Sequence, residues 1–226
     1  MSGSFIKFPS TPHLAWLGAH PARSDKVLGE AEAAEFLAQP VVVEEKVDGA
    51  NVGISFDSNG HMIVQNRGSV LKPGDGGQFA LLWKWLAERE GRLLDVLEDR
   101  LFLFGEWCYA RHSIHYTRLP DYFLMFDIFD KHAGKFLNSM RRDRIAAELA
   151  LTTVPRIAAG LLTMASVTSL IGSSSLYDGP MEGVYLRRDD DCWLLKRAKI
   201  VRAEFVQNLE EHWSKKTPVA NQLARK

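Results

Sequence analysis

Hydrophobic residues along the chain follow two patterns, one typical of strands and one typical of helices. Seven short runs are rich in Val, Ile, Leu and Phe or alternate polar with apolar residues, as strands do. These runs are residues 40–47, 50–56, 61–66, 101–107, 122–129, 183–187 and 192–196. Turn-forming residues at 58–60 predict that the first three runs form hairpins, and residues 188–191 predict the turn between the last two.

Four longer segments between these runs carry apolar residues at helical spacing. They are residues 29–37, 79–89, 139–151 and 202–213. Ser139 occupies a position typical of a helix N-cap. Helices among antiparallel hairpins predict an α+β fold, and the short Pro/Gly-rich stretches predict loops within one domain spanning residues 1–226.

Composition narrows the class of protein without naming a function. The chain has 226 residues, with 46% hydrophobic and 25% charged residues, which is typical of a globular protein. Lys plus Arg and Asp plus Glu are each 28, which argues against a highly basic coat protein but allows a local basic groove. We expect no secretory signal and no transmembrane helix. Cys108 and Cys192 are too few for a disulfide framework or a zinc site, which favours a reducing, cytoplasmic setting.

The most informative peptide surrounds Lys46, in the run Glu-Glu-Lys-Val-Asp-Gly-Ala-Asn at 44–51. A lysine that ends an apolar strand before a glycine turn is expected at the floor of a cleft. Taken alone, the peptide is better explained as an edge lysine beside two glutamates, because Lys-x-Asp-Gly is common by chance.

Five further peptides favour the interpretation of Lys46 as a cleft lysine, because of their order along the chain. They are Asn66-Arg67-Gly68, Phe104-Gly105-Glu106-Trp107, Phe126-Asp127-Ile128-Phe129-Asp130, Glu182-Gly183-Val184-Tyr185 and Leu195-Lys196-Arg197-Ala198-Lys199. Each has an ordinary explanation as a salt-bridge partner, a core aromatic residue or a solvated basic face. Their joint occurrence in this order is very improbable by accident.

This ordered set resembles the covalent nucleotidyltransferase superfamily of ATP-dependent DNA and RNA ligases and mRNA capping enzymes, over residues 40–200. The resemblance implies two twisted antiparallel sheets flanked by helices, with the nucleotide between them. We expect no OB-fold domain, because too few residues follow Lys199 in this sequence to form one. Asn51, the segment 105–116 and the opening 8–14 are similar to the RNA ligases of the phage double-strand-repair and bacterial types.

The resemblance implies an ATP-dependent RNA ligase that uses Mg²⁺ or Mn²⁺. Lys46 would attack the α-phosphate of ATP to form lysyl-AMP, AMP would pass to an RNA 5′-phosphate, and a 3′-hydroxyl would displace AMP. The attacking amine must be neutral, although free lysine has a pKa of about 10.4. We expect burial and a nearby cation, either Lys199 or the metal, to lower the pKa of Lys46, against the opposing effect of Glu45 and Asp48.

The resemblance also assigns roles residue by residue. The expected catalytic residues are Lys46 and Lys199. The expected nucleotide-binding residues are Glu45, Lys46, Asn51, Arg67, Glu106, Phe126, Glu182, Lys196 and Lys199, with Glu182 also binding the metal. One departure concerns the last motif, which usually has two lysines two residues apart. Here Lys196 and Lys199 are three apart, so either Arg197 replaces the first lysine or a bulge shifts the register.

Basic and aromatic residues suggest where RNA would bind. The candidate contacts are Arg111, His112, His115 and Arg118, although a solvated helix with a core histidine would explain them equally well. Residues 196–226 hold eight Lys/Arg and three Glu, a net charge of +5, and so the other 195 residues sum to −5. We therefore expect residues 200–226 to form a helical, basic tail.

The expected partner is RNA with 5′-phosphate and 3′-hydroxyl ends, bound by a cytoplasmic monomer that acts in RNA repair and has no contact with membranes. Two alternatives remain open at this point. One is a DNA-nick ligase or capping-type core, and the other is a non-catalytic nucleic-acid-binding module with a decayed site. The presence of Lys46, Glu106 and Glu182 argues against decay.

Overall fold

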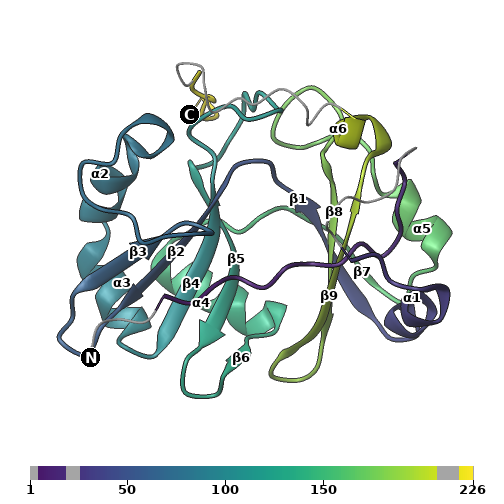
Figure 1. Cartoon of the computed structure of the whole chain (residues 1–226), viewed down its shortest axis with the longest axis horizontal. Coiled ribbons are helices and arrows are strands. Elements are labelled where there is room, and N and C mark those ends of the chain that lie inside the picture. Colours follow the sequence, from purple (N-terminus) through teal and green to yellow (C-terminus); the bar gives the residue numbers. More distant parts are fainter. Residues whose placement is uncertain (1–4, 19–25, 208–218, 226) are drawn as a thin grey trace.

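The structure is a computed structural model that describes residues 5–18, 26–207 and 219–225. Two antiparallel sheets make up its centre (Figure 1). The four-stranded sheet has the order β7-β1-β8-β9, and the five-stranded sheet has the order β3-β2-β4-β5-β6. The strands are β1 Val41–Lys46, β2 Ala50–Phe56, β3 Met62–Gln65, β4 Leu101–Trp107, β5 Phe123–Asp130, β6 Lys135–Phe136, β7 Arg156–Gly160, β8 Gly183–Asp189 and β9 Leu194–Val201.

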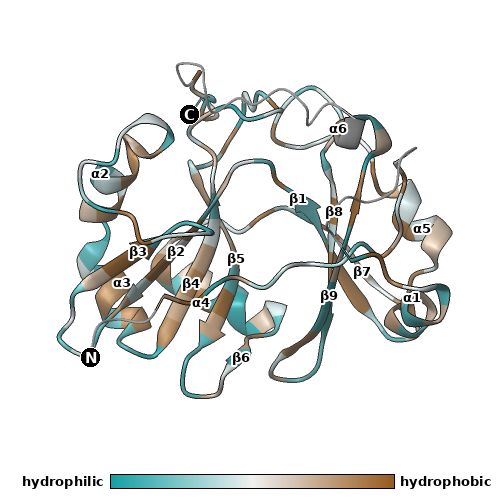
Figure 2. Ribbon diagram, viewed as in Figure 1, coloured by the Kyte–Doolittle hydropathy of each residue, from teal (hydrophilic) through white to brown (hydrophobic). Residues whose placement is uncertain are grey.

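Helices cover the outer face of each sheet, which confirms the predicted class and the two flanked sheets. The helices of the described residues are α1 Glu30–Leu37, the 3₁₀ turn η1 Gly77–Phe79, α2 Leu82–Ala87, α3 Glu90–Leu97, α4 Ser139–Leu149, α5 Met164–Ser169 and α6 Ala203–Gln207. One hydrophobic core joins α2, α3 and α4 to the five-stranded sheet, and a second joins α1 and α5 to the four-stranded sheet. Figure 2 shows the hydrophobic strands that supply these cores.

The first predicted hairpin is wrong, and the error concerns the position of Lys46. Strand β2 pairs with β3 as predicted, but β1 pairs with β7 and β8 and not with β2. Asp48 and Gly49 carry the chain from one sheet to the other instead of closing a tight turn. Lys46 therefore stands where the chain crosses between the sheets.

The last hairpin is longer than predicted. Strand β8 continues to Asp189 and β9 runs from Leu194 to Val201, so the turn lies at 190–193 and the basic residues lie within the strand. The predicted helix 79–89 divides into η1 and α2, whereas β6, β7, α3 and α5 were not predicted. The cap of α4 is Asn138 and not Ser139, because the Asn138 side chain accepts the hydrogen bond from Arg141 N.

The predicted helix 202–213 is seen only as α6, and residues 208–213 lie outside the described part of the chain. The segment 5–18 crosses in front of both sheets (Figure 1). It exchanges hydrogen bonds between Ile6 and the Gln65 side chain at one end, and Leu14 N donates to Lys199 O at the other. None of the helices in the described residues combines the length and apolar character that crossing a membrane requires.

Candidate active site

A cleft of about 550 Å³ lies between the two sheets, and Lys46 stands in it. Its volume is within the range of small-molecule sites. Residues of both sheets, of the segment 5–18 and of the loops between strands line the cleft. They are Phe8, Thr11, Glu44, Glu45, Lys46, Val47, Asp48, Gly49, Ala50, Asn51, Asn66, Arg67, Gln78, Phe79, Glu106, His112, Phe126, Val154, Tyr185 and Lys199.

Lys46 is held by a carboxylate from the neighbouring strand. Its backbone is paired with Gly183 at the start of β8, and its Nζ lies 2.5 Å from Oε1 of the buried Glu182. Gly183 permits the close approach of β8 to β9 at this point, because a Cβ there would lie 2.1 Å from the Ile200 carbonyl oxygen. The sequence predicted a lysine at the floor of a cleft, and Lys46 lines this cleft, but its contact with Glu182 was not predicted.

The charges around Lys46 oppose the expected lowering of its pKa. Burial acts to lower the pKa of Lys46, but Glu182, Glu106 and Asp48 together outweigh burial and raise it. In the protein without nucleotide or metal these carboxylates dominate, and the predicted lowering of the Lys46 pKa requires that a metal or nucleotide neutralise them. The ammonium is the stable form of Lys46 until another positive charge neutralises these carboxylates.

Burial raises the pKa values of two glutamates near Lys46, Glu106 and Glu182, toward neutrality. Burial raises the pKa of Glu106 to about 8, with Glu182 and Asp48 adding to the increase and Lys46 opposing it. Burial likewise raises the pKa of Glu182 to about 7, against the opposing effect of Lys46. Glu106 lines the cleft, and Glu182 does not line it but contacts Lys46, which does. Buried carboxyls with pKa values near neutrality are typical of a site that binds or transfers charge.

Asp48 is fixed by the loop that follows β4. Its Oδ2 accepts hydrogen bonds from Ser113 N at 2.7 Å and Ile114 N at 3.0 Å, and Asp48 N donates to the Tyr116 hydroxyl at 2.8 Å. His112 Nδ1 lies 4.0 Å from Asp48 Oδ1. Sequence reasoning gave Asp48 only an electrostatic effect on Lys46, so this anchoring is new.

The basic residues of β9 lie on opposite faces of its sheet, which decides which of them reach the cleft. Lys199 lines the cleft, and Arg197, two residues away, is on the same face. Lys196 is on the other face and contacts Glu35 of α1, with 2.7 Å between Nζ and Oε1. The predicted place of Lys196 at the nucleotide is therefore wrong, and Arg197 and Lys199 have the family's spacing.

The remaining predicted nucleotide contacts come together at the cleft. Asn51 of β2 and Glu106 of β4 are directly paired, and Arg67 is exposed at the rim after β3. Phe126 of β5 also lines the cleft, with Phe8 packed edge-on at 5.2 Å between ring centroids. Glu45 lines the cleft too, although its carboxylate accepts a hydrogen bond from Ser174 Oγ at 2.5 Å.

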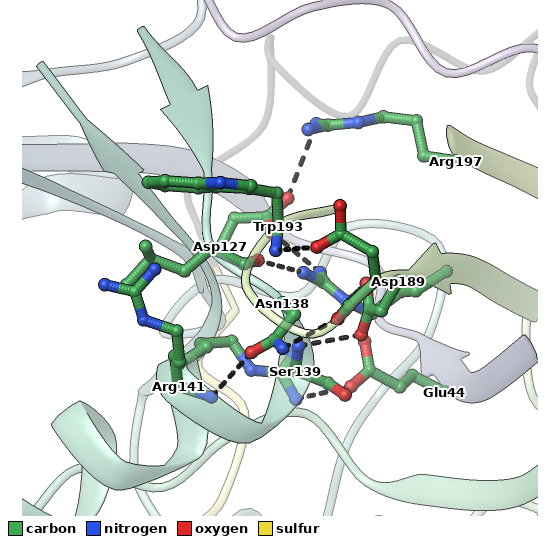
Figure 3. A network of polar contacts seen from close by, with 12 residues as sticks. Glu44, Asp127, Asn138, Ser139, Arg141, Asp189, Trp193 and Arg197 are labelled. Atoms are coloured by element: carbon green, nitrogen blue, oxygen red, sulfur yellow. Dashed lines mark hydrogen bonds and ion pairs between the residues drawn. The ribbon is translucent and has the colours of Figure 1, made fainter. Parts of the chain in front are cut away.

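A buried charge network lies beside Phe126 and ties the two sheets together. Arg187 of β8 donates to Asp127 Oδ1 at 2.7 Å and to the Phe126 carbonyl at 3.1 Å. Arg142 of α4 donates to the same carbonyl at 2.9 Å and to Glu44 Oε1 at 2.6 Å. Figure 3 shows the neighbouring contact, in which Arg197 approaches Asp127 at 3.4 Å.

The predicted RNA contacts divide between the cleft and the surface. His112 lines the cleft and lies 2.9 Å from Gln78 Oε1, and burial lowers the pKa of His112. Arg111 is exposed, and Arg118 is exposed with an ion pair to Asp178 at 2.6 Å. His115 is half-buried, and its Nε2 has no hydrogen-bond partner among the described residues.

Several cleft residues escaped sequence reasoning. Phe8 and Thr11 lie in the opening segment, which carried a family resemblance without any assigned role. Asn66 adjoins the predicted Arg67, so its neighbour was the available signal. Tyr185 stands in the quoted motif with Glu182, which was the available signal for it, whereas Gln78 had none, because only the packing of η1 brings it to the cleft.

Glu182 provides one feature that fits the expected metal. Its Oε2 is buried and accepts no hydrogen bond from the described residues, while Oε1 faces Lys46. A carboxylate oxygen is a ligand that Mg²⁺ and Mn²⁺ prefer. In the described ranges, however, His, Cys, Asp and Glu side chains do not gather in groups of three or more that could hold a metal ion. A cation here would need further ligands from water or a bound phosphate.

Solved structures of an RNA ligase from Naegleria gruberi share this two-sheet fold. The ligase solved with PPi gives a TM-score of 0.63 at 20% identity, covering 92% of this chain and 65% of that one. A mutant of it with ATP and Mn gives 0.60 at 19% identity, covering 89% and 62%. Another mutant, with AMP and Mn, gives 0.59 at 20% identity. This chain thus spans less than two thirds of the length of those ligases.

The two sheets and the cleft between them therefore have the fold of these solved structures. The RNA ligase family model matches residues 39–201, which is more than half of the chain. The protein belongs to the RNA ligase family. Among curated proteins there is no match.

Proposed function

We propose that the protein is an ATP-dependent RNA ligase in which Lys46 carries AMP. Lys46 would form lysyl-AMP, AMP would pass to an RNA 5′-phosphate, and a 3′-hydroxyl would then displace AMP to form the phosphodiester. The observation that carries the proposal is the position of Lys46, in the cleft and 2.5 Å from Glu182. Membership of the RNA ligase family supports the same chemistry.

The first step requires a proton acceptor for Lys46. The bond from Lys46 Nζ to the α-phosphorus of ATP forms as the bond from that phosphorus to the bridging oxygen breaks, and pyrophosphate leaves. Glu182 Oε1 already contacts Nζ, and the Glu182 pKa of about 7 lies near the working pH. Glu182 is therefore suited to accept the proton that Lys46 must lose before it attacks.

The cleft residues have distinct roles toward the nucleotide in this proposal. Phe126 would stack on adenine, and Phe8 would support the Phe126 ring from its edge. Glu106 would bind the ribose hydroxyls. Lys199 and Arg67 would bind the phosphates, because cations placed at non-bridging oxygens stabilise the charge of phosphoryl transfer.

Three further residues would complete the nucleotide site. Glu45 adjoins Lys46 and lines the cleft, and its buried carboxylate is held by the Ser174 hydroxyl. Asn51 lines the cleft, and its Oδ1 is buried without a hydrogen-bond partner in the described part of the chain. Glu182 would hold Mg²⁺ or Mn²⁺ through Oε2. When bound, the cation supplies positive charge against the phosphates and the carboxylates around Lys46.

The substrate is proposed as RNA with 5′-phosphate and 3′-hydroxyl ends, in RNA repair. The loop after β4, the β-strand that carries Glu106, holds the candidate RNA contacts Arg111, His112, His115 and Arg118. An RNA strand that enters the cleft would pass this loop. We also propose a cytoplasmic monomer with a single domain over residues 1–226 and a basic tail over 200–226. Residues 208–218 and 226 of that tail lie outside the described residues.

The test is covalent labelling of the purified protein. The protein is mixed with α-labelled ATP, GTP or NAD and Mg²⁺, and label on the denatured band is measured. We expect label from ATP in the wild type, none in Lys46→Ala, and normal labelling in Lys84→Ala, which removes an exposed lysine of α2. No label from any nucleotide would overturn the proposal, and label that persists in Lys46→Ala would exclude this nucleophile.

A second assay decides the nucleic acid. Nicked duplex RNA, nicked duplex DNA and single-stranded RNA are each supplied with a 5′-phosphate. Sealing of RNA substrates is expected, and sealing of nicked DNA alone would contradict the RNA assignment.

A further inference from the structure

Residues 219–225 lie outside the part of the chain that matches the family model. They pair with the loop at 108–119, which lies inside it. Backbone hydrogen bonds run along both sides of this contact. They are Arg111 N to Val219 O at 2.7 Å, Asn221 N to Tyr109 O at 2.8 Å, Gln222 N to Tyr116 O at 2.9 Å, Leu119 N to Gln222 O at 3.0 Å and Ala224 N to Leu119 O at 2.8 Å. The segment therefore holds the loop at both of its ends.

Asn221 is the buried centre of this contact. It is 2% exposed. Its amide nitrogen donates to Cys108 O at 2.8 Å and to Ala110 O at 3.3 Å, and its Oδ1 accepts from Tyr116 N at 2.9 Å. One side chain thus satisfies main-chain groups at the beginning and near the end of the loop, in a place where unpaired groups are costly.

The same loop holds Asp48 in place beside Lys46. Ser113 N and Ile114 N donate to the Asp48 carboxylate, and the Tyr116 hydroxyl accepts from Asp48 N. The other end of the loop continues directly from β4, which carries Glu106. A shift of the loop would therefore move Asp48 together with the chain crossing that follows Lys46.

We propose that Asn221 is a positioning residue for the formation of lysyl-AMP. It fixes the 108–119 loop, and the loop fixes Asp48 and the turn that aims Lys46 into the cleft. The inference rests on the proposed ligase function and deepens it, because it places a residue near the chain's C-terminal end in the control of the first step. Asn221 itself does not line the cleft.

The test compares Asn221→Ala with Gln222→Ala in single-turnover labelling by α-labelled ATP and Mg²⁺. Gln222 is exposed and pairs with the loop through its backbone, so its variant is the matched control. Misplacement of a reacting group by about 1 Å costs on the order of 100-fold in rate. Since Asn221 acts at one remove, we expect the labelling rate constant to fall at least about tenfold, with the KM for ATP little changed.

The rate constant and the amplitude of labelling separate positioning from a loss of folded protein. If Asn221 only stabilised the fold, the amplitude would fall with the folded fraction while the rate constant of the folded molecules stayed normal. That result would overturn the proposal, as would a rate constant equal to that of Gln222→Ala. Absence of label in the wild type would instead contradict the ligase function itself, so the two failures are distinguishable.

Tyr116→Phe gives a second variant that keeps the buried ring and removes only the hydroxyl that contacts Asp48 N. We expect it to slow labelling as well. In the double variant Asn221→Ala/Tyr116→Phe, the two effects should combine to less than their product, because both act through the same loop. Independent, multiplicative effects would contradict the proposed route. If Asn221→Ala folds poorly, Tyr116→Phe alone still tests the route, and labelling of Tyr116→Phe at the wild-type rate would contradict it.

Discussion

Replacing Arg187 by Met would test whether the buried charge network holds the two sheets around the cleft. Both Arg187 and Asp127 have fully buried side chains and lie 2.7 Å apart. Arg187 also donates to the carbonyls of Phe126 and Leu137. Met fills a similar volume but leaves these acceptors and the Asp127 carboxylate without their donor.

The expected cost can be estimated from the geometry. Removing one partner of a buried ion pair destabilises a protein by about 3–5 kcal/mol. Arg197 remains 3.4 Å from Asp127, so we expect a value near the lower end, about 3 kcal/mol. For a chain of this size, about 2–4 °C is lost per kcal/mol, which corresponds to a fall in Tm of about 6–12 °C.

The assay is urea unfolding at pH 7, monitored by tryptophan fluorescence. The matched control is Arg188→Met. Arg188 is the next residue of β8 and lies 3.5 Å from the exposed Glu35, so its loss should cost less than about 1 kcal/mol. Equal stability losses in the two variants would refute the reasoning. In the double variant Arg187→Met/Asp127→Leu, much of the lost stability should return, because the stranded charge is gone.

Three further predictions concern the cleft. Gly183→Ala should slow labelling and lower the Tm, because its Cβ would lie 2.1 Å from the Ile200 carbonyl oxygen, and normal rates would contradict this account. The pKa of Glu106 is raised from its ordinary 4.5 to about 8 in the folded protein. The contribution of this shift to the free energy of unfolding is therefore complete below pH 4.5 and is lost as the pH rises through 8. Urea midpoints from pH 5 to 8 should therefore decline less in Glu106→Gln than in the wild type, and parallel declines would exclude the shift. Lys199→Ala should reduce labelling at least about tenfold, whereas Lys196→Ala should label normally, and the reverse order would restore Lys196 to the nucleotide.

Short motifs pointed to most of the predicted residues that line the cleft, and the hydrophobic pattern predicted the fold class but not the pairing of every strand. Lys46, Glu106 and Glu182 each end or begin a strand that hydrophobic runs had already indicated, and the sheets bring them together. The β1–β2 hairpin failed because the local pattern shows where strands end but not which sheet each strand joins. Lys196 failed because its face depends on the exact register of β9, which continues to Val201.

Features that depend on distant packing could not be predicted from the local sequence. The pKa of Lys46 is set by carboxylates from β4 and from the start of β8, far away along the chain. Asn221 is a single polar residue outside any motif, and its importance arises from the loop 108–119 that it contacts. Strand β7 was missed because Arg156–Gly160 is short and half-exposed, with little hydrophobic pattern.

The most direct test of the central claim is to locate AMP on the protein by mass spectrometry. The protein is incubated with ATP and Mg²⁺ without RNA, denatured, digested and sequenced by fragmentation. The account predicts one adenylylated peptide, modified at Lys46 through an acid-labile bond, and its loss when pyrophosphate is added before denaturation. AMP on another residue, or none on Lys46 in folded protein that binds ATP, would contradict it.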